Sequence, residues 1–231
     1  MPIIHDSEFG KITIRRSARA SQIRLSVAPD GNLRASLPSY APLFLVKRLL
    51  SASRDELRQM ISRSHNTTTY TSGMLIGKSH TLIISQTTGN NYKIWRYGQQ
   101  IVASLPTSRT LKEPEIEKAL REVIVSALRI EAKSYLPKRL SFLAKKYDYN
   151  YERVRFSHAS GRWGSCSTTG TISLNIALMK LPFELIDYVI IHELTHTKHM
   201  NHSHDFWALV GHADANYKAH KRALKLENPS V

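Results

Sequence analysis

The sequence predicts an α+β protein with a β-rich N-terminal half and a mainly helical C-terminal half. Over the first 110 of its 231 residues, short runs alternate between apolar and polar side chains and are separated by turn-forming residues, which is typical of half-buried strands. From Glu113 onward, apolar residues recur three and four positions apart, which is typical of helices with one buried face. The length allows two small domains, and we expect them at residues 1–110 and 111–231.

The N-terminal domain is expected to contain two groups of short strands with one helix between them. Pro29-Asp30-Gly31-Asn32 predicts a turn in the first group, because Pro presets φ and Gly or Asn accepts positive φ. Pro42 is expected to open a helix that runs to about Arg63, and a Thr-rich polar loop follows at residues 65–72. No internal repeat is recognisable. The strands are expected at residues 11–16, 22–28, 33–37, 74–77, 81–85, 92–97 and 100–105.

The C-terminal half is expected to begin with a long helix after a linker at residues 106–112. Pro137 has no amide hydrogen, so we expect it to kink or split this helix before the helix resumes to about Lys146. Two strands, at residues 154–158 and 171–174, are expected next. A further helix is predicted to begin near Pro182 and to end at about Asn201.

The charge is strongly basic, with 33 Lys and Arg against 18 Asp and Glu and a formal net charge of +15. Residues 1–110 hold 15 basic and 5 acidic residues, which fits a domain that binds nucleic acid or another polyanion and fits a solubilising surface equally well. The single cysteine, Cys166, cannot form an intrachain disulfide and is typical of a reducing compartment. We find no signal peptide and no apolar run long enough to cross a bilayer, so we expect a cytoplasmic protein without a membrane partner. The composition does not predict an oligomeric state.

Residues 192–196 read His-Glu-Leu-Thr-His within a segment that is expected to be helical. Residues four apart lie on one face of a helix, so His192 and His196 can present two imidazoles to one zinc ion. Glu193 follows His192, so its side chain leaves the helix beside such an ion, where a general base takes a proton from bound water. Catalytic zinc usually has three protein ligands and one open position, so a third ligand is expected.

His202 is the expected third ligand because it lies six residues past His196. The same offset occurs in the motif H-E-x-x-H-x-x-G-x-x-H, although here His199 takes the place of the glycine. His199 and His204 remain alternative ligands. Ser203 is expected to cap a new helix.

A short segment at Trp163 and Cys166 allows two interpretations. It reads equally well as an edge strand that pairs with an extended substrate and as part of the core. Arg162 fits a surface ion pair or a contact to a substrate anion. One of three further residues could stabilise an oxyanion, but side chains of these types more often have structural roles, so none is assigned; they are His212, Tyr217 and His220.

Several stretches together resemble one known family. They are Arg162-Trp163-Gly164-Ser165-Cys166-Ser167, Leu174-Asn175, Pro182, residues 186–189, the motif at 192–196, Asn201-His202-Ser203, Phe206-Trp207 and the N-terminal tract at residues 14–25. In these stretches the chain resembles the YgjP-like metallopeptidases, which are related to SprT-like and other compact zincins. The resemblance implies a zincin-like helical domain with a short antiparallel sheet after the β-rich domain. It also implies His192, His196 and His202 as zinc ligands and Glu193 as the catalytic residue, and it leaves the substrate open.

These observations predict a zinc-dependent hydrolase, and first of all a metallopeptidase that acts on peptides or proteins. Two alternatives stay open. The same metal centre could hydrolyse phosphoanhydrides such as nucleotides, although no Gly-rich phosphate loop is visible. The basic N-terminal domain could also tether a protease to nucleic acid, a role that the SprT-like relatives make plausible.

Overall fold

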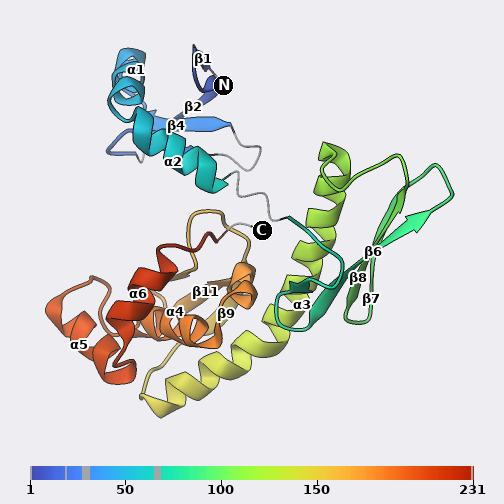
Figure 1. Cartoon of the computed structure of the whole chain (residues 1–231). Coiled ribbons are helices and arrows are strands. Elements are labelled where there is room, and N and C mark those ends of the chain that lie inside the picture. The colour runs from blue at the N-terminus through green and yellow to red at the C-terminus, as the bar shows by residue number, and fades with distance from the viewer. Residues whose placement is uncertain (1, 19, 28–31, 65–68, 230) are drawn as a thin grey trace. The chain divides into compact units, whose positions relative to one another are not determined.

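The computed structural model describes residues 2–18, 20–27, 32–64, 69–229 and 231 (Figure 1). The chain divides into two compact units, Met1–Thr69 and Tyr70–Val231. Both units contain strands and helices, and the predicted α+β class is confirmed. Among the residues described, no helix has the length and apolar character needed to cross a membrane.

The first unit contains a four-stranded sheet. Its strands are β1 (Ile3–Asp6), β2 (Gly10–Ser17), β3 (Arg24–Val27) and β4 (Leu33–Pro38), in the spatial order β1-β2-β4-β3. β2 and β4 run parallel, and the outer strands pair with them antiparallel. Successive side chains of a strand point to opposite faces of the sheet, so alternate residues enter the core. Ile12 and Ile14 of β2 and Leu37 of β4 are fully buried there. Of the turn predicted at residues 29–32, residues 29–31 lie outside the described part of the chain.

Two helices complete this unit, α1 (Leu43–Ala52) and α2 (Arg54–Ser64). The prediction of one continuous helix was wrong at Ser53, where φ is −117° and ψ is 26°. Val46, Leu50 and Leu57 all enter the core of the unit. Their spacing continues across the break, which is why periodicity alone did not reveal it. In the loop predicted to follow, residues 65–68 lie outside the part of the chain that is described.

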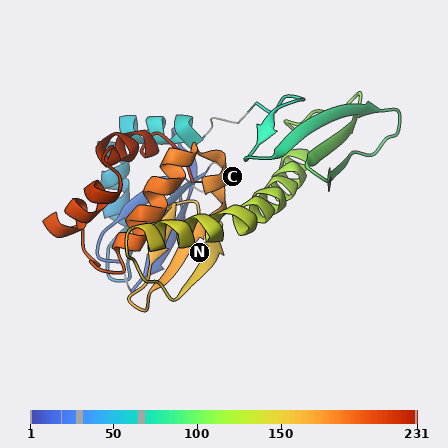
Figure 2. The same cartoon turned by 90° about the horizontal axis from the view of Figure 1, so that it is seen from below.

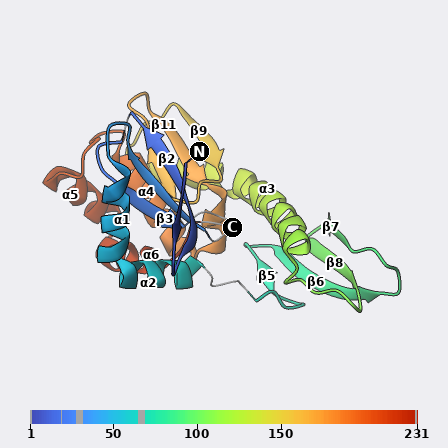
Figure 3. The ribbon, with the colours of Figure 1, turned by 90° about the horizontal axis from the view of Figure 1, so that it is seen from above.

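The second unit also opens with a four-stranded sheet, which Figure 3 shows beside α3. Its strands are β5 (Leu75–Ile76), β6 (His80–Thr87), β7 (Lys93–Tyr97) and β8 (Gln100–Pro106), in the order β5-β6-β8-β7. Leu82, Ile101 and Ala103 share one hydrophobic core with the following helices. The observed division therefore falls after Thr69, and not at residue 110 where the sequence placed the domain boundary.

The two sheets repeat one topology. In each sheet, the second and fourth strands along the chain lie in the centre and run parallel to each other. The first strand pairs antiparallel with the second at one edge, and the third pairs antiparallel with the fourth at the other edge. Each sheet also ends with the same tetrapeptide, Ala35-Ser36-Leu37-Pro38 in β4 and Ala103-Ser104-Leu105-Pro106 in β8. This repeat cannot be recognised from the amino-acid sequence, because an identity of four residues is not significant by itself.

The long helix α3 (Pro114–Lys146) connects the β5–β8 sheet with the remaining helices of the unit (Figure 2). It contains Pro137 and continues through it as one helix, so the predicted split does not occur, and a kink at this residue stays a prediction. Pro137 removes one helical hydrogen bond, but Leu136 and Leu140 on either side are fully buried. Their packing keeps both segments helical.

The rest of the unit is built around the central helix α4 (Phe183–Thr195). The other elements here are β9 (Arg153–Ser157), β10 (Gly164–Cys166), β11 (Thr171–Asn175), the 3-10 helix η1 (Ile176–Lys180), α5 (His204–Ala213) and α6 (Tyr217–Leu224). α4 is apolar on most of its surface and therefore lies in the core. The small sheet has the order β10-β11-β9 and is mixed, not antiparallel, because β9 runs parallel to β11. The chain crosses from β9 to the far edge, forms β10 and returns through a hairpin as the middle strand.

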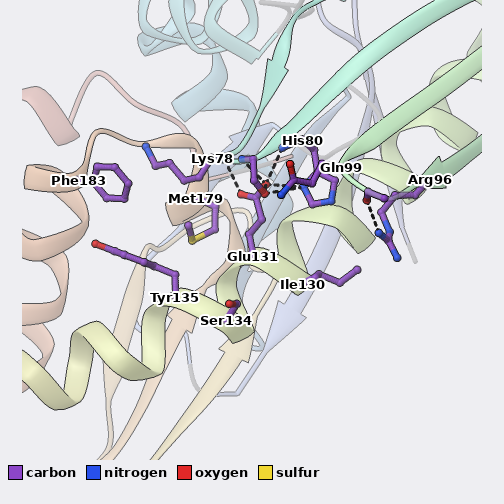
Figure 4. A pocket seen from close by; sticks show the side chains of 12 residues that line it. Lys78, His80, Arg96, Gln99, Ile130, Glu131, Ser134, Tyr135, Met179 and Phe183 are labelled. Carbon is purple, nitrogen blue, oxygen red and sulfur yellow. Dashed lines mark hydrogen bonds and ion pairs between the residues drawn. The ribbon is translucent and has the colours of Figure 1, made fainter.

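Hydrogen bonds to Glu131 of α3 link the β5–β8 sheet to the helix (Figure 4). The Glu131 carboxylate accepts hydrogen bonds from the amides of Lys78, Ser79 and His80, and lies 2.6 Å from the His80 ring nitrogen Nδ1. Gly77 has a φ of +69°, and a Cβ there would overlap this carboxylate, so glycine is required. Burial raises the pKa of Glu131, but the hydrogen bonds, with that from the Lys78 amide first, outweigh burial and hold the pKa below its ordinary value.

Replacing Glu131 by Gln is expected to lower the free energy of unfolding by about 2 kcal/mol at neutral pH, since an ionised acceptor of several donors is lost. Because the folded-state pKa lies below the ordinary 4.5, the ionised group stabilises the fold above that pH. This contribution is lost as the pH falls through the folded-state pKa. Urea unfolding at neutral pH and at about pH 3 measures the difference, which should shrink in acid. Glu122→Gln, on an exposed position of α3, is the control, and equal losses in both variants would contradict the role of Glu131.

Candidate metal centre

Two of the three predicted zinc ligands, His192 and His196, lie at the C-terminal end of α4. His192 and His196 are four residues apart, so both side chains leave the same face. The helix ends at Thr195, and His196 is its C-cap residue, whose amide donates to the His192 carbonyl. The end predicted at Asn201 was therefore wrong by about one and a half turns of helix.

A tight turn after α4 returns the chain past the helix end. The amide and the hydroxyl of Thr197 both donate to the Leu194 carbonyl, the latter at 2.7 Å. Side-chain bonding of this kind competes with helical bonding and stops the helix here. Beyond the turn, the Ser203 hydroxyl accepts from the Phe206 amide and caps α5, as the sequence predicts. His202 is thereby held between a turn and a helix cap.

The structure brings together the three histidines that the sequence singled out. One nitrogen from each of His192, His196 and His202 lies within 4.8 Å of the other two. The ring centroids are 4.9, 5.0 and 4.8 Å apart. Within the described part of the chain, no other group of histidine, cysteine and acidic side chains converges in this way.

The two alternative third histidines do not enter this group. The side chain of His204 is 96% exposed and lies 3.6 Å from the Asp205 carboxylate. His199 contributes its backbone instead, because its carbonyl oxygen lies 3.1 Å from Nδ1 of His196. Nδ1 of His196 is thus the hydrogen-bond donor, and Nε2 keeps a free lone pair.

The environment keeps two of the rings neutral. Burial, followed by the charges of His196, His202 and Lys221, lowers the pKa of His192 to about 3. Burial also lowers the pKa of His196, and this effect outweighs the hydrogen bond to the His199 carbonyl, which raises the pKa. Neutral imidazole is the form that binds a metal ion, so both rings are ready to do so near pH 7.

The residues present fit a bound metal ion. Nε2 of His202 and Nε2 of His192 face each other at 3.1 Å. The other ring nitrogen of His192, Nδ1, is buried and has no hydrogen-bond partner among the described residues. Three imidazoles form a donor set that zinc takes in catalytic centres.

Glu193, the residue after His192, has a buried carboxylate. It is 6% exposed, and burial raises its pKa to about 8, while the charge of Arg162 lowers it. No hydrogen bond reaches this carboxylate from any residue that the structure describes. An uncompensated buried carboxylate is costly, and a cation held by the histidines would compensate it.

The edge strand β10 packs directly on Glu193. A Cβ placed on Gly164 would lie 2.7 Å from Cγ and from Oε1 of Glu193, so only glycine allows this approach. Asn175 fixes the segment before β10, because its side-chain amide donates to the carbonyls of Ala159 and Arg162 at 2.7 and 2.9 Å. The sequence singled out Asn175 only as part of a resemblance and did not reveal this role.

Cys166 of β10 is not suited to nucleophilic chemistry. Burial raises the pKa of its thiol, and the charge of Glu193 raises it further, so the thiol stays protonated near pH 7.

Aromatic side chains of α5 support the three imidazoles. The fully buried Phe206 has its ring centroid 5.0, 4.7 and 4.8 Å from those of His192, His196 and His202. Trp207 stacks on His202 at 5.6 Å. The sequence contained a signal for these roles, since both residues lie in the first turn of the helix that Ser203 caps.

The three unassigned candidates lie outside the group of histidines. Tyr217 stacks on Trp207 at 5.5 Å, His220 pairs with Asp214 at 2.7 Å, and the ring of His212 lies 6.4 Å from that of Tyr147. The cavity of about 340 Å³ in Figure 4 is also separate. It reaches Phe183 at the start of α4, roughly 14 Å along the helix from His192.

One family model and several solved structures match the chain. No curated protein matches the chain. Among solved structures, the metallopeptidase zymogen of Pyrococcus abyssi abylysin is 27% identical over 41% of this chain and 98% of its own, with a TM-score of 0.36. The metallopeptidase zymogen of Methanocaldococcus jannaschii jannalysin is 22% identical over 39% of this chain and 91% of its own, with a TM-score of 0.34. The family described as YgjP-like, metallopeptidase domain, matches residues 21–227, and the chain therefore belongs to the YgjP-like metallopeptidases.

Proposed function

We propose that this protein hydrolyses peptide bonds with a zinc ion held by His192, His196 and His202 and with Glu193 as the general base. The observation that carries the proposal is the convergence of the three imidazoles, and the residue that follows the first of them, Glu193, has a buried carboxylate. Membership of a metallopeptidase family supports the choice of a peptide substrate. An all-imidazole donor set favours zinc over magnesium or calcium, which prefer oxygen ligands.

The reaction assigns each group a separate task. Zinc, when bound, supplies a Lewis acid that polarises a peptide carbonyl and makes water more acidic. Glu193 accepts a proton from the attacking water and then delivers it to the leaving amine. Packing against Gly164 holds the carboxylate in position, and Phe206 holds the imidazoles.

The substrate is proposed to bind along β10. This strand lies at the edge of its sheet, and it pairs with β11 on one side only. An extended peptide can add to such an edge through backbone hydrogen bonds, which would place a peptide bond beside Glu193. This favours the edge-strand interpretation of the segment at Trp163 and Cys166.

A metal add-back experiment tests the proposal. The protein is stripped with a chelator and incubated with a peptide library derived from a proteome, with and without one equivalent of zinc, and the products are identified by mass spectrometry. We expect peptide cleavage only with the metal. A zinc-loaded protein that cleaves no peptide and hydrolyses nucleoside triphosphates would contradict the proposal and favour the phosphoanhydride alternative.

Replacing Gly164 by Ala is expected to lower kcat about a hundredfold with little change in zinc content, because the new methyl group must displace the Glu193 carboxylate. Gly161→Ala is the matched control, because its Cβ would meet no atom within 4 Å. Steady-state kinetics on a cleaved peptide, with zinc analysis of both variants, checks this. Equal activity of the two variants would show that the contact between Gly164 and Glu193 does not position the base.

A further inference from the structure

The side chain of Lys221 in α6 lies near the candidate metal centre. Nζ of Lys221 lies 3.9 Å from the centroid of the Trp207 ring. That ring stacks on His202 at 5.6 Å with an interplanar angle of 23° and lies 5.9 Å from the ring of His192. The ammonium group is therefore separated from the histidines by a single aromatic side chain.

The charge of Lys221 is not neutralised by a carboxylate among the described residues, since no ion pair there includes it. The carboxylate of Asp214, which precedes α6, is already engaged by His220 at 2.7 Å. Asp205 of α5 is 75% exposed and pairs with His204. The cation on the Trp207 ring thus remains available to a negatively charged ligand.

A second cation lies on the β10 side. Arg162 comes just before the edge strand, and its backbone is fixed by the hydrogen bond from Asn175. Its side chain is exposed and forms no ion pair within the described ranges. Arg162 lies two positions before Gly164, the residue of β10 whose backbone packs against the Glu193 side chain.

We propose that Lys221 and Arg162 make this centre select peptides with acidic side chains near the scissile bond. The inference rests on the proposed peptidase function and names its substrate class. Complementary charge raises both the rate of encounter and the affinity of such peptides, and the effect weakens as salt screens the charges. The unit that holds the centre carries 22 basic and 13 acidic residues, so its overall field acts in the same direction.

The test compares cleavage of two peptides that differ only in having Glu or Lys on both sides of one cleaved bond. We expect the wild-type protein to prefer the acidic peptide, and Lys221→Glu to lower the acidic-to-basic ratio of kcat/KM by about tenfold. Lys221→Met keeps the packing on Trp207 and should give a smaller shift in the same direction. Lys118→Glu is the matched control, because it makes the same charge change on an exposed position near the start of α3 and should change the ratio far less.

A second measurement is the affinity of both peptides for the zinc-loaded Glu193→Gln protein, by fluorescence anisotropy at low and high salt. Tighter binding of the acidic peptide at low salt supports the inference. Cleavage of both peptides at equal rates, or a ratio unaffected in both Lys221 variants, overturns the inference and leaves the proposed function standing. Absence of any peptide cleavage by the zinc-loaded wild type overturns both.

Discussion

Replacing Glu193 by Gln is expected to lower kcat by about a thousandfold and to leave zinc content unchanged. Gln has nearly the same shape but cannot take a proton from water, and Glu193 is not one of the converging ligands. The loss should appear in kcat and not in KM, because the proton is transferred only in the transition state. Kinetics on a cleaved peptide, together with metal analysis by mass spectrometry, measures both quantities.

Glu184→Gln is the matched control for this variant. Glu184 lies on the first turn of the same helix and is exposed, so its replacement removes the same charge far from the histidines. We expect wild-type kinetics from it. Substantial activity of the Glu193→Gln protein would show that another group acts as the base, even if zinc stays bound.

Replacing His202 by Ala is expected to weaken zinc binding by at least about a hundredfold and to abolish activity at ordinary zinc concentrations. Removal of one of three imidazoles leaves only the pair on α4. Because the metal binds the folded state, the added thermal stability that zinc provides should also be lost. Competition with a chromophoric chelator gives the affinity, and thermal unfolding with and without zinc gives the stability.

His204→Ala provides the control, since this exposed imidazole lies two residues away and does not enter the group. Its zinc affinity should match that of the wild type. The reverse result, with affinity lost in His204→Ala and kept in His202→Ala, would assign the third ligand to His204.

Much of the candidate centre could be predicted from the sequence because its determinants are local. A spacing of four on a helix places His192 and His196 on one face whatever surrounds them. The Ser203 cap depends only on the next three residues, and it fixes where α5 begins. The offset of His202 from His196 was also informative, although the chain reaches it by a different turn from the one that glycine supplies.

Other features were beyond the sequence because they depend on tertiary packing. The contact between Gly164 and Glu193 joins residues 29 positions apart in β10 and α4. The approach of Lys221 to Trp207 likewise depends on how α5 and α6 pack. The continuity of α3 through Pro137 and the inclusion of β5–β8 in the second unit follow from a shared core that no local pattern reveals.

Two predictions from the charge and cysteine content remain predictions. The first unit carries 11 basic and 5 acidic residues, and salt-dependent binding of the full-length protein to nucleic acid would test the polyanion partner. Cytoplasmic localisation is tested by fractionation of cells.

Zinc K-edge X-ray absorption of the loaded protein tests the central claim most directly, because it reports the atoms around the ion. We expect three imidazole nitrogens and one further light atom at about 2.0–2.1 Å, and no sulfur. A spectrum with two or fewer imidazoles, or with the Cys166 sulfur at about 2.3 Å, would contradict the proposed centre.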